Sequence, residues 1–320
     1  MQYRIYLQSN NLTFNSMIFN NPYVVCFGEI LWDIFPEGSR AGGAPFNAAY
    51  HIHKSGIDVK MLSRVGNDNL GQKLLDQIKN WGLATDYIQT DNEHPTSTVI
   101  ATINEDNEAS YDIVNHVAWD YINILPIHEE LVSKAEAFIF GSLSARNEKT
   151  RETLFSLIEH AKLKIFDVNF RPPYMDVECI KFLLHKADIV KMNKAEMKQI
   201  IQFLEKEYTD EENCALAIME YFNIKEIVLT KGSQGARYFI NNRNYNFEAL
   251  PIVISDTVGS GDSFLSGFIS KRIQGKSQKE IMKEAIALGA FITSKSGACP
   301  EYDYQEFEDF RNSNYEKKEI

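Results

Sequence analysis

The segment Asp256–Phe264 combines glycines and acidic residues in a pattern that suits the handling of a phosphoryl group. The apolar run Ile252–Ile254 before it predicts a strand, and the residues after it have the periodicity of a helix. Glycines at 259 and 261 let the backbone pass close to a ligand, and the first N–H groups of the helix lack partners within it. Because these donors and the helix dipole attract negative charge, Gly259, Ser260 and Gly261 are predicted to form an anion site. Such a site stabilises the charge on a phosphoryl group in transfer.

Asp262 falls in the first turn of the same predicted helix. The commoner role of an aspartate there is to cap the helix. Next to an anion site, its carboxylate could instead be the general base that takes a proton from an attacking hydroxyl. The spacing leaves both interpretations open. Two other nucleotide-binding motifs are excluded. Phe264 stands where a dinucleotide-binding fingerprint requires a third glycine, and the segment Gly66–Gly71 does not continue into the Gly-Lys-Ser/Thr ending of a Walker A loop.

A glycine pair, Gly42-Gly43, opens a second predicted helix that runs to about Lys54. The glycines let the backbone approach a polar ligand, and Asn47 in the first turn offers both a donor and an acceptor. An ordinary junction between a loop and a helix has the same composition. This pattern too leaves a structural and a functional interpretation open.

The elements that must position these residues alternate regularly after residue 120. Continuous apolar runs of strand length are separated by helical patterns, which predicts a mostly parallel sheet with helices on both faces. A hairpin is predicted in 237–250, and two helices at about 261–273 and 277–295 follow it. The predicted strands of the sheet are Tyr23–Gly28, Ala137–Phe140, Lys164–Val168, Ile189–Met192 and Glu226–Thr230.

One stretch departs from this alternation. Ser97–Ile103 and Ser110–Val114 alternate polar and apolar residues around a polar turn at 104–108, which predicts a β-hairpin. An antiparallel hairpin with one polar face can cover a pocket as a lid or simply decorate an edge, and the pattern alone fits both.

The composition limits the class of protein. The chain has 320 residues and a formal net charge of −11, and it lacks a long basic tract, so we expect no nucleic acid partner. No run reaches the roughly 18–20 apolar residues of a membrane span. The four cysteines have no metal-binding spacing, so we expect free thiols and a reducing, cytoplasmic location. Residues 1–20 lack the features of a secretion signal, and we expect a disordered N-terminal extension there or a translation start at Met17.

The glycine motifs together resemble those of a known family. Asp256–Asp262 is similar to the C-terminal signature of the ribokinase-like, or PfkB, carbohydrate kinases, and Gly42-Gly43-x-x-x-Asn47 is similar to their N-terminal signature. The resemblance implies an α/β ribokinase-like fold, with a mostly parallel central sheet flanked by helices on both faces and a small β lid. It implies that Asp262 is the catalytic base beside an anion hole of residues 259–261. It also implies that the first glycine pair and Asn47 bind sugar hydroxyls.

Three more segments match the family in the same order. Asp33 matches an early acidic residue that binds a pair of sugar hydroxyls, although an isolated aspartate there would more often be a turn residue. The segment Asp167–Arg171 matches one that lies where the two substrates meet, which implies a substrate contact for Asn169 and charge neutralisation by Arg171. Asn193-x-x-Glu196 matches a motif that organises ATP and Mg²⁺, largely through water, although such a spacing alone is more often a helix cap.

The resemblance extends to the nucleotide and to a monovalent cation. The segment that contains Thr230, Lys231, Gly232 and Gly235 resembles the family's ATP loop. Asp256 and Thr257 begin a loop that binds a monovalent cation, such as K⁺, in many members, with 294–300 as its other side.

The sugar is less well defined. Gly28–Pro36, Ala118–Asp120 and Phe170–Tyr174 resemble bacterial fructokinases, which implies the conversion of fructose to fructose 6-phosphate with ATP and Mg²⁺. Only Arg40 lies near the glycine pair, which argues against a phosphorylated acceptor. A 2-keto-3-deoxygluconate kinase and a ribokinase remain alternatives. Tyr111 on the predicted hairpin is a candidate to contact fructose or to bind the carboxylate of 2-keto-3-deoxygluconate, and ordinary packing of the hairpin fits it equally well. A catalytically silent sugar sensor is the non-enzyme alternative.

The resemblance covers about 23–311, so we expect 21–320 to form one kinase domain with lid segments at about 33–46 and 95–118. An exposed lid hairpin could also pair across a two-fold axis, which would give a homodimer.

Overall fold

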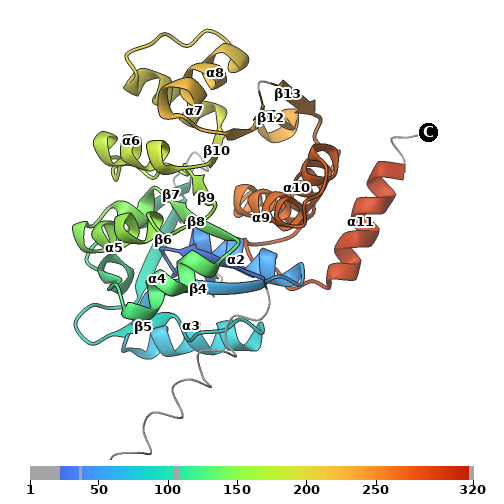
Figure 1. Ribbon diagram of the computed structural model, residues 1–320. Coiled ribbons are helices and arrows are strands. Elements are labelled where there is room, and N and C mark those ends of the chain that lie inside the picture. Colours follow the sequence, from blue (N-terminus) through green and yellow to red (C-terminus); the bar gives the residue numbers. More distant parts are fainter. Residues whose placement is uncertain (1–21, 36–37, 104–108, 242, 317–320) are drawn as a thin grey trace, which may run out of the picture.

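The computed structural model describes residues 22–35, 38–103, 109–241 and 243–316, with the backbone alone for 100–103 and 109–112. Nine strands form one large sheet through the middle of the molecule (Figure 1). In spatial order they are β13 (Arg243–Phe247), β12 (Ala236–Ile240), β11 (Glu226–Thr230), β10 (Ile189–Asn193), β9 (Lys164–Asp167), β8 (Ala137–Gly141), β1 (Tyr23–Phe27), β4 (Asp58–Gly66) and β5 (Ile88–Asp91).

The order of the strands reverses at the centre of this sheet. The strands from β11 to β5 pair in parallel, and only β12 and β13 are antiparallel. The chain places β4 and β5 on one side of β1 and then β8 to β11 on the other, so β1 and β8 flank a topological switch point. In open sheets of this kind a ligand binds outside the carboxyl ends of the strands at such a point.

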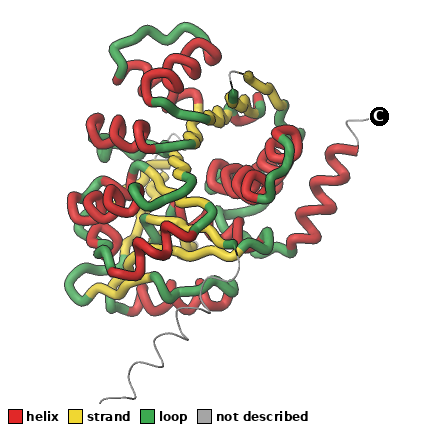
Figure 2. The backbone as a smooth tube through the Cα atoms, in the orientation of Figure 1, coloured by secondary structure: helices red, strands yellow, loops and turns green. Residues whose placement is uncertain are grey.

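Helices cover both faces of the large sheet. Alternate residues of β1 point to opposite faces, so Val25 packs in one core and Val24 in the other. In Figure 1, α5 and α6 lie to the left of the sheet and α9, α10 and α11 to its right, and Figure 2 shows the strands between the two helical layers. One layer comprises α4 (Pro126–Lys134), α5 (Glu148–Ile158), α6 (Val177–Lys186), α7 (Lys194–Phe203) and α8 (Glu211–Phe222). The other comprises α2 (Ala44–Lys54), α3 (Asn69–Asn80), α9 (Ser260–Ile273), α10 (Gln278–Thr293) and α11 (Tyr304–Glu316).

A second, four-stranded sheet carries the predicted hairpin. Its order is β3 (Gly38–Gly42), β2 (Leu31–Phe35), β6 (Ser97–Ile103) and β7 (Ala109–Ile113). The predicted hairpin is confirmed as β6 and β7, which pair antiparallel, while its turn at 104–108 lies outside the described residues. The structure adds that β2 pairs in parallel with β6 and antiparallel with β3, so the two predicted lid segments belong to one sheet.

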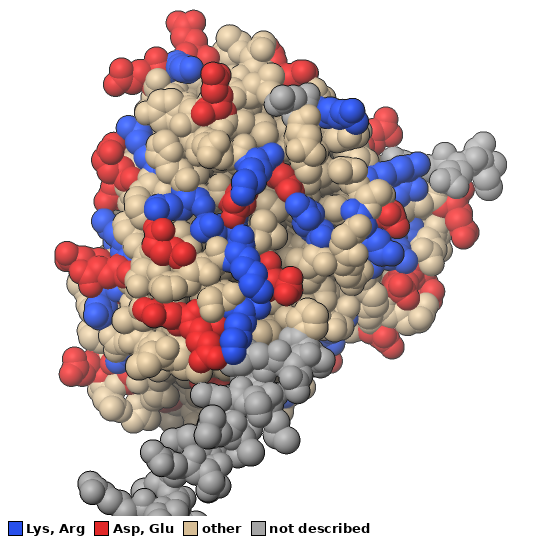
Figure 3. Space-filling model, in the orientation of Figure 1, with Lys and Arg blue, Asp and Glu red and all other residues tan. Residues whose placement is uncertain are grey.

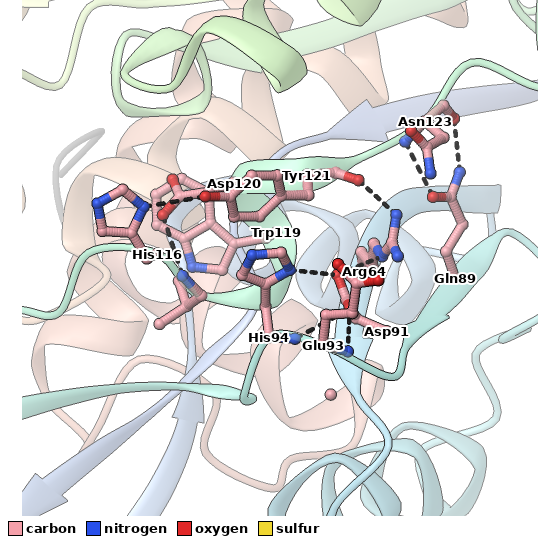
Figure 4. A network of polar contacts seen from close by, with 12 residues as sticks. Arg64, Gln89, Asp91, Glu93, His94, His116, Trp119, Asp120, Tyr121 and Asn123 are labelled. Atoms are coloured by element: carbon pink, nitrogen blue, oxygen red, sulfur yellow. Dashed lines mark hydrogen bonds and ion pairs between the residues drawn. The ribbon is translucent and has the colours of Figure 1, made fainter.

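A polar network fixes the base of the small sheet to the large one (Figure 4). The Asp91 carboxylate at the end of β5 forms an ion pair with Arg64, with Oδ2 2.9 Å from its Nε, and contacts Nδ1 of His94 at 3.1 Å. The His94 ring stacks on Tyr121, with 3.6 Å between ring centroids. Asp120 forms a buried bidentate ion pair with Arg146, at 2.7 and 2.8 Å. The segments that enter and leave β6–β7 are therefore held by charged contacts to the main body of the fold.

One local prediction was wrong. The apolar run at 252–254 is not a strand but an irregular segment, in which Val253 is 88% and Ile254 63% exposed. Hydrophobicity alone cannot distinguish a buried strand from an apolar loop. Asp33 lies in β2, opposite Arg40 of β3, which rules out the alternative of a turn residue.

On the face of the molecule shown in Figure 3, Lys and Arg side chains are mixed with Asp and Glu side chains. None of the helices in the described part of the chain combines the length and hydropathy that a bilayer span requires.

Candidate active site

The predicted site residues lie where parallel strands end together. In the register of the sheet, Asp167 of β9 lies beside Lys191 of β10, and Asn193 of β10 lies beside Thr230 of β11. Because parallel strands present their carboxyl ends at one edge, this pairing gathers three of the segments singled out in the sequence.

The helix α9 begins in the glycine motif at 259–261, as predicted. Gly259 is the N-cap of α9 with φ +73°, a backbone conformation that favours glycine, and a Cβ there would lie 2.7 Å from Cα of Ala298. No side chain caps the helix, and the Ser260 N–H donates to the Thr257 carbonyl at 3.3 Å. The N–H groups of Gly261 and Asp262 are left to bind a ligand. The cap interpretation of Asp262 therefore does not apply: its Oδ2 instead accepts a hydrogen bond from Nδ2 of Asn47 at 2.8 Å.

The environment of Asp262 changes its proton affinity. Burial, followed by the nearby Asp167 carboxylate, raises the pKa of Asp262, while Lys191, the Asn47 hydrogen bond and Arg171 oppose the rise. A carboxylate with a raised pKa is a better proton acceptor than an ordinary aspartate.

The first glycine pair brings Asp33 to the same place. A Cβ on Gly42 would lie 2.3 Å from Oδ2 of Asp33, so a larger residue there would displace that carboxylate. Gly43, with φ +114°, is the N-cap of α2 and directs Asn47 toward Asp262. Burial raises the pKa of Asp33 to about 6, with Arg171 and Arg40 lowering it and Asp262 raising it. Asp33 is thus electrostatically linked to the base candidate.

Two charged groups of the site were not predicted as site residues. Glu29 follows β1 and is 3% exposed, with its Oε2 accepting a hydrogen bond from Ser144 at 3.1 Å across the switch point. Lys191 is 6% exposed, and its Nζ donates to both oxygens of Asp167 at 2.9 and 3.1 Å. A lysine inside the apolar strand 189–192 is a signal that the sequence does contain, but its partner lies on a neighbouring strand.

Asn193 and Glu196 form a capping box at the start of α7. The Asn193 side chain accepts from the N–H groups of Ala195 and Glu196 at 2.8 and 3.0 Å. The Glu196 carboxylate, in a side chain that is 6% exposed, accepts from Asn193 N–H at 2.7 Å and Phe170 N–H at 3.3 Å. The cap interpretation is therefore correct, and the contact ties α7 to the 167–171 segment.

The predicted ATP loop follows β11. Gly232 and Gly235 have φ +56° and +86°, and a Cβ on Gly235 would lie 2.0 Å from the Phe247 carbonyl oxygen. The Lys231 ammonium lies 3.4 Å from Glu211 of α8, and the Thr230 hydroxyl donates weakly to Met192 O at 3.4 Å. The loop is thus held against the edge that carries Asn193.

The loop at Asp256 is joined to residues 294–300, as predicted. Asp256 Oδ2 accepts the Gly297 N–H at 2.9 Å, and its Oδ1 accepts the Val258 N–H at 3.0 Å. Arg40 of β3 places a guanidinium nitrogen 3.7 Å from the same carboxylate. Thr257 is exposed, and its carbonyl accepts the Ser260 N–H at 3.3 Å.

The remaining predicted residues are placed less tightly. Arg171 is exposed, but it is close enough to act on the pKa of Asp262 and Asp33. Asn169 has φ +37°, and its carbonyl accepts from Ser142 at 3.3 Å. The Tyr111 side chain lies outside the described residues.

Relatives with known names share this architecture. A probable fructokinase-5 from Arabidopsis thaliana is 27% identical over 311 residues, which is 88% of this chain and 94% of that protein. The crystal structure of a fructokinase with bound ATP from Xylella fastidiosa has a TM-score of 0.80 at 21% identity, covering 92% of this chain and 99% of that one.

A fructokinase from Vibrio cholerae O395, a double mutant bound to fructose, ADP and potassium ion, has a TM-score of 0.77 at 21% identity, covering 90% of this chain and 98% of that one. These likenesses show the ribokinase-like fold. The family model of the pfkB family carbohydrate kinases matches residues 23–303, nearly the whole of the described chain. The chain belongs to the pfkB family of carbohydrate kinases and is a sugar kinase.

Proposed function

We propose that this sugar kinase transfers the γ-phosphoryl group of ATP to fructose and forms fructose 6-phosphate. The observation that carries the proposal is the hydrogen bond between Asn47 of the first glycine motif and Asp262 of the second, which joins the sugar end and the phosphate end of the site. The choice of fructose is supported by relatives that are named fructokinases and by the fructose complex of the Vibrio protein.

In this mechanism Asp262 accepts the proton of the sugar hydroxyl as its oxygen attacks the γ-phosphorus. The bond from that oxygen to phosphorus forms, and the bond from phosphorus to the bridging oxygen of ADP breaks. The N–H groups of 259–261, at the start of α9, stabilise the charge on the phosphoryl group. Asn47 holds the base in place, and Asp33 accepts hydrogen bonds from sugar hydroxyls, with Asn169 as a further contact and Arg171 neutralising phosphate charge.

The nucleotide lies, in our proposal, along Asn193 and the loop of Thr230, Lys231, Gly232 and Gly235. The loop is rich in glycine, and Asn193 and Thr230 lie side by side at the carboxyl ends of their strands, the same edge of the sheet as Asp262. Magnesium, when bound, neutralises phosphate charge. Glu196 fits an outer contact through water, since backbone N–H groups already use part of its acceptor capacity.

Potassium is proposed for the loop of Asp256 and Thr257. The carboxylate of Asp256 and the adjoining 294–300 backbone supply oxygen ligands of the type such a cation takes. Activity that rises when K⁺ replaces choline at constant ionic strength would support this site, and equal activity in the two salts would contradict it.

We also propose that 21–320 is one kinase domain, with 33–46 and 95–118 as its lid, located in the cytoplasm. A homodimer through the small sheet is part of this proposal. Sedimentation at several protein concentrations tests it, and a monomer at every concentration would contradict it.

The acceptor is tested by coupling ADP release to NADH oxidation, with Mg-ATP and a panel of fructose, ribose, 2-keto-3-deoxygluconate, adenosine and fructose 6-phosphate. We expect the largest kcat/KM with fructose and a ³¹P signal of a 6-phosphate product. A larger kcat/KM on another member would replace the acceptor and keep the kinase mechanism. No turnover on any member would favour a sugar sensor.

A further inference from the structure

Lys191 is a buried cation at the reacting end of the site. It belongs to β10, its side chain is 7% exposed, and both oxygens of Asp167 lie within hydrogen-bond distance of its Nζ. Taking a lysine out of water is costly even when it is paired. An ion pair that served stability alone could be replaced by apolar residues at little cost, so this placement calls for another role.

The position of the ammonium relative to α9 indicates that role. A Cβ on Gly261 would lie only 2.9 Å from Nζ of Lys191, so the ammonium packs directly against the first turn of α9. That turn carries the N–H groups of Gly261 and Asp262, which no side chain caps. A fixed positive charge at this distance, in a site screened from water, adds strongly to the attraction of those N–H groups for an anion.

The carboxylates around Lys191 keep its ammonium protonated and hold it in place. Burial would lower the pKa of Lys191, but the carboxylates of Asp167, Glu196 and Asp262 outweigh burial and raise it, so the side chain stays protonated. Asp167 holds the ammonium from the side of β9, while Gly261 leaves the side of α9 open to it.

We propose that Lys191 is a cationic component of the anion hole, which stabilises the phosphoryl group in transfer, and that Asp167 is the positioning residue that holds its ammonium in place. The lysine gives up no proton, and its charge acts on the transferring group. The proposal rests on the kinase function proposed above and adds to it a cationic residue beside Gly261.

The test uses the full chain with Lys191→Met. We expect kcat to fall by about 100-fold or more, as for the loss of one donor of an oxyanion hole, with KM for the sugar within about threefold of wild type. A second readout is independent of turnover: the affinity for Mg-ADP with and without aluminium fluoride, an anionic mimic of the transferring group. Aluminium fluoride should tighten ADP binding in wild type but not in Lys191→Met, while ADP alone binds both alike.

A kcat within about threefold of wild type, or an equal tightening by aluminium fluoride in both proteins, would contradict the proposal. The proposal would also be contradicted if Lys191→Met weakened the binding of ADP alone as much as the binding of ADP with aluminium fluoride, because Lys191 would then be a structural support of the nucleotide loop. An inactive wild type would contradict only the proposed acceptor, since the aluminium fluoride readout still tests Lys191.

Two further variants separate charge from folding. Lys191→Met leaves Asp167 buried without its cation, so the double variant Lys191→Met/Asp167→Asn removes both charges and should fold while still lacking the aluminium fluoride effect. Arg272→Met is the matched control. It breaks the 2.7 Å ion pair with Glu226 near the other end of α9, about 15 Å along the helix from Asp262, and should leave kcat unchanged.

Discussion

At the scale of single residues, the site depends on side chains that lie close together although they are far apart in the chain. Asn47 and Asp262 are separated by 215 positions and joined by one hydrogen bond of 2.8 Å. The glycines beside them leave space for functional groups: Gly42 for the carboxylate of Asp33, and Gly261 for the ammonium of Lys191. A larger residue at either position would displace the functional group beside it.

The base should give kcat a characteristic dependence on pH. Burial raises the pKa of Asp262 above its ordinary value of 3.8, and the residue accepts a proton only when ionised. We therefore expect kcat to fall as the pH is lowered through this raised pKa, with a midpoint above 3.8. A kcat that stays constant down to pH 4 would contradict a base of this kind.

Asp33 should reduce stability in the absence of sugar. Its pKa is about 6 in the folded protein against 3.8 ordinarily, so the folded state binds the proton more tightly, and stability falls as the pH rises from about 4 to 6. Asp33→Asn should therefore stabilise the sugar-free protein at pH 8 by roughly 1–3 kcal/mol, while KM for the sugar rises. Urea unfolding measures the difference. At pH 4 it should vanish, and an unchanged or lower stability at pH 8 would be inconsistent with this account.

At the scale of elements, the site is held together by two loop-to-helix junctions and by the polar network of Asp91 and Asp120 beneath the small sheet. α9 presents its uncapped start to the ligand, α2 presents Asn47, and the small sheet brings Asp33 and Arg40 over them. The small sheet is held at its base by the contacts of Asp91, Asp120 and their partners (Figure 4).

The ion pair of Asp120 and Arg146 should be important for the stability of the polar network beneath the small sheet. Both side chains are at most 2% exposed, and Arg146 also donates to the Val114 carbonyl just after β7. Arg146→Met should lower the free energy of unfolding by about 3–5 kcal/mol, because it leaves a buried carboxylate unpaired, and should raise KM for the sugar. The double variant with Asp120→Asn should recover part of the stability. A loss below about 1 kcal/mol in the single variant would contradict this role.

Local patterns were enough to predict β1 and β8–β11, the β6–β7 hairpin and the two glycine junctions, because helix starts and buried strands depend on neighbouring residues. They were not enough where the deciding partner is distant. The sheet in which β2 places Asp33 depends on pairing with β3 and β6, and the role of Lys191 depends on Asp167 of another strand. The apolar run at 252–254 was predicted to be a strand because of its hydrophobicity, but in the structure Val253 and Ile254 are exposed and do not belong to the sheet.

At the scale of the whole molecule, topology explains how an acidic chain can present a site for an anionic substrate. The net charge is −11, yet the edge at the switch point combines helix N-termini with Lys191 and Arg171. The family match over residues 23–303 shows that the chain is a sugar kinase.

The most direct test of the account is the rate of ADP release with Mg-ATP and fructose for wild type and Asp262→Asn, with ADP affinity measured on the same samples. The account predicts rapid turnover in wild type, a loss of at least about 1,000-fold in the variant, and ADP binding that is nearly unchanged. Near-normal turnover in Asp262→Asn would contradict the central claim that Asp262 is the base of this kinase.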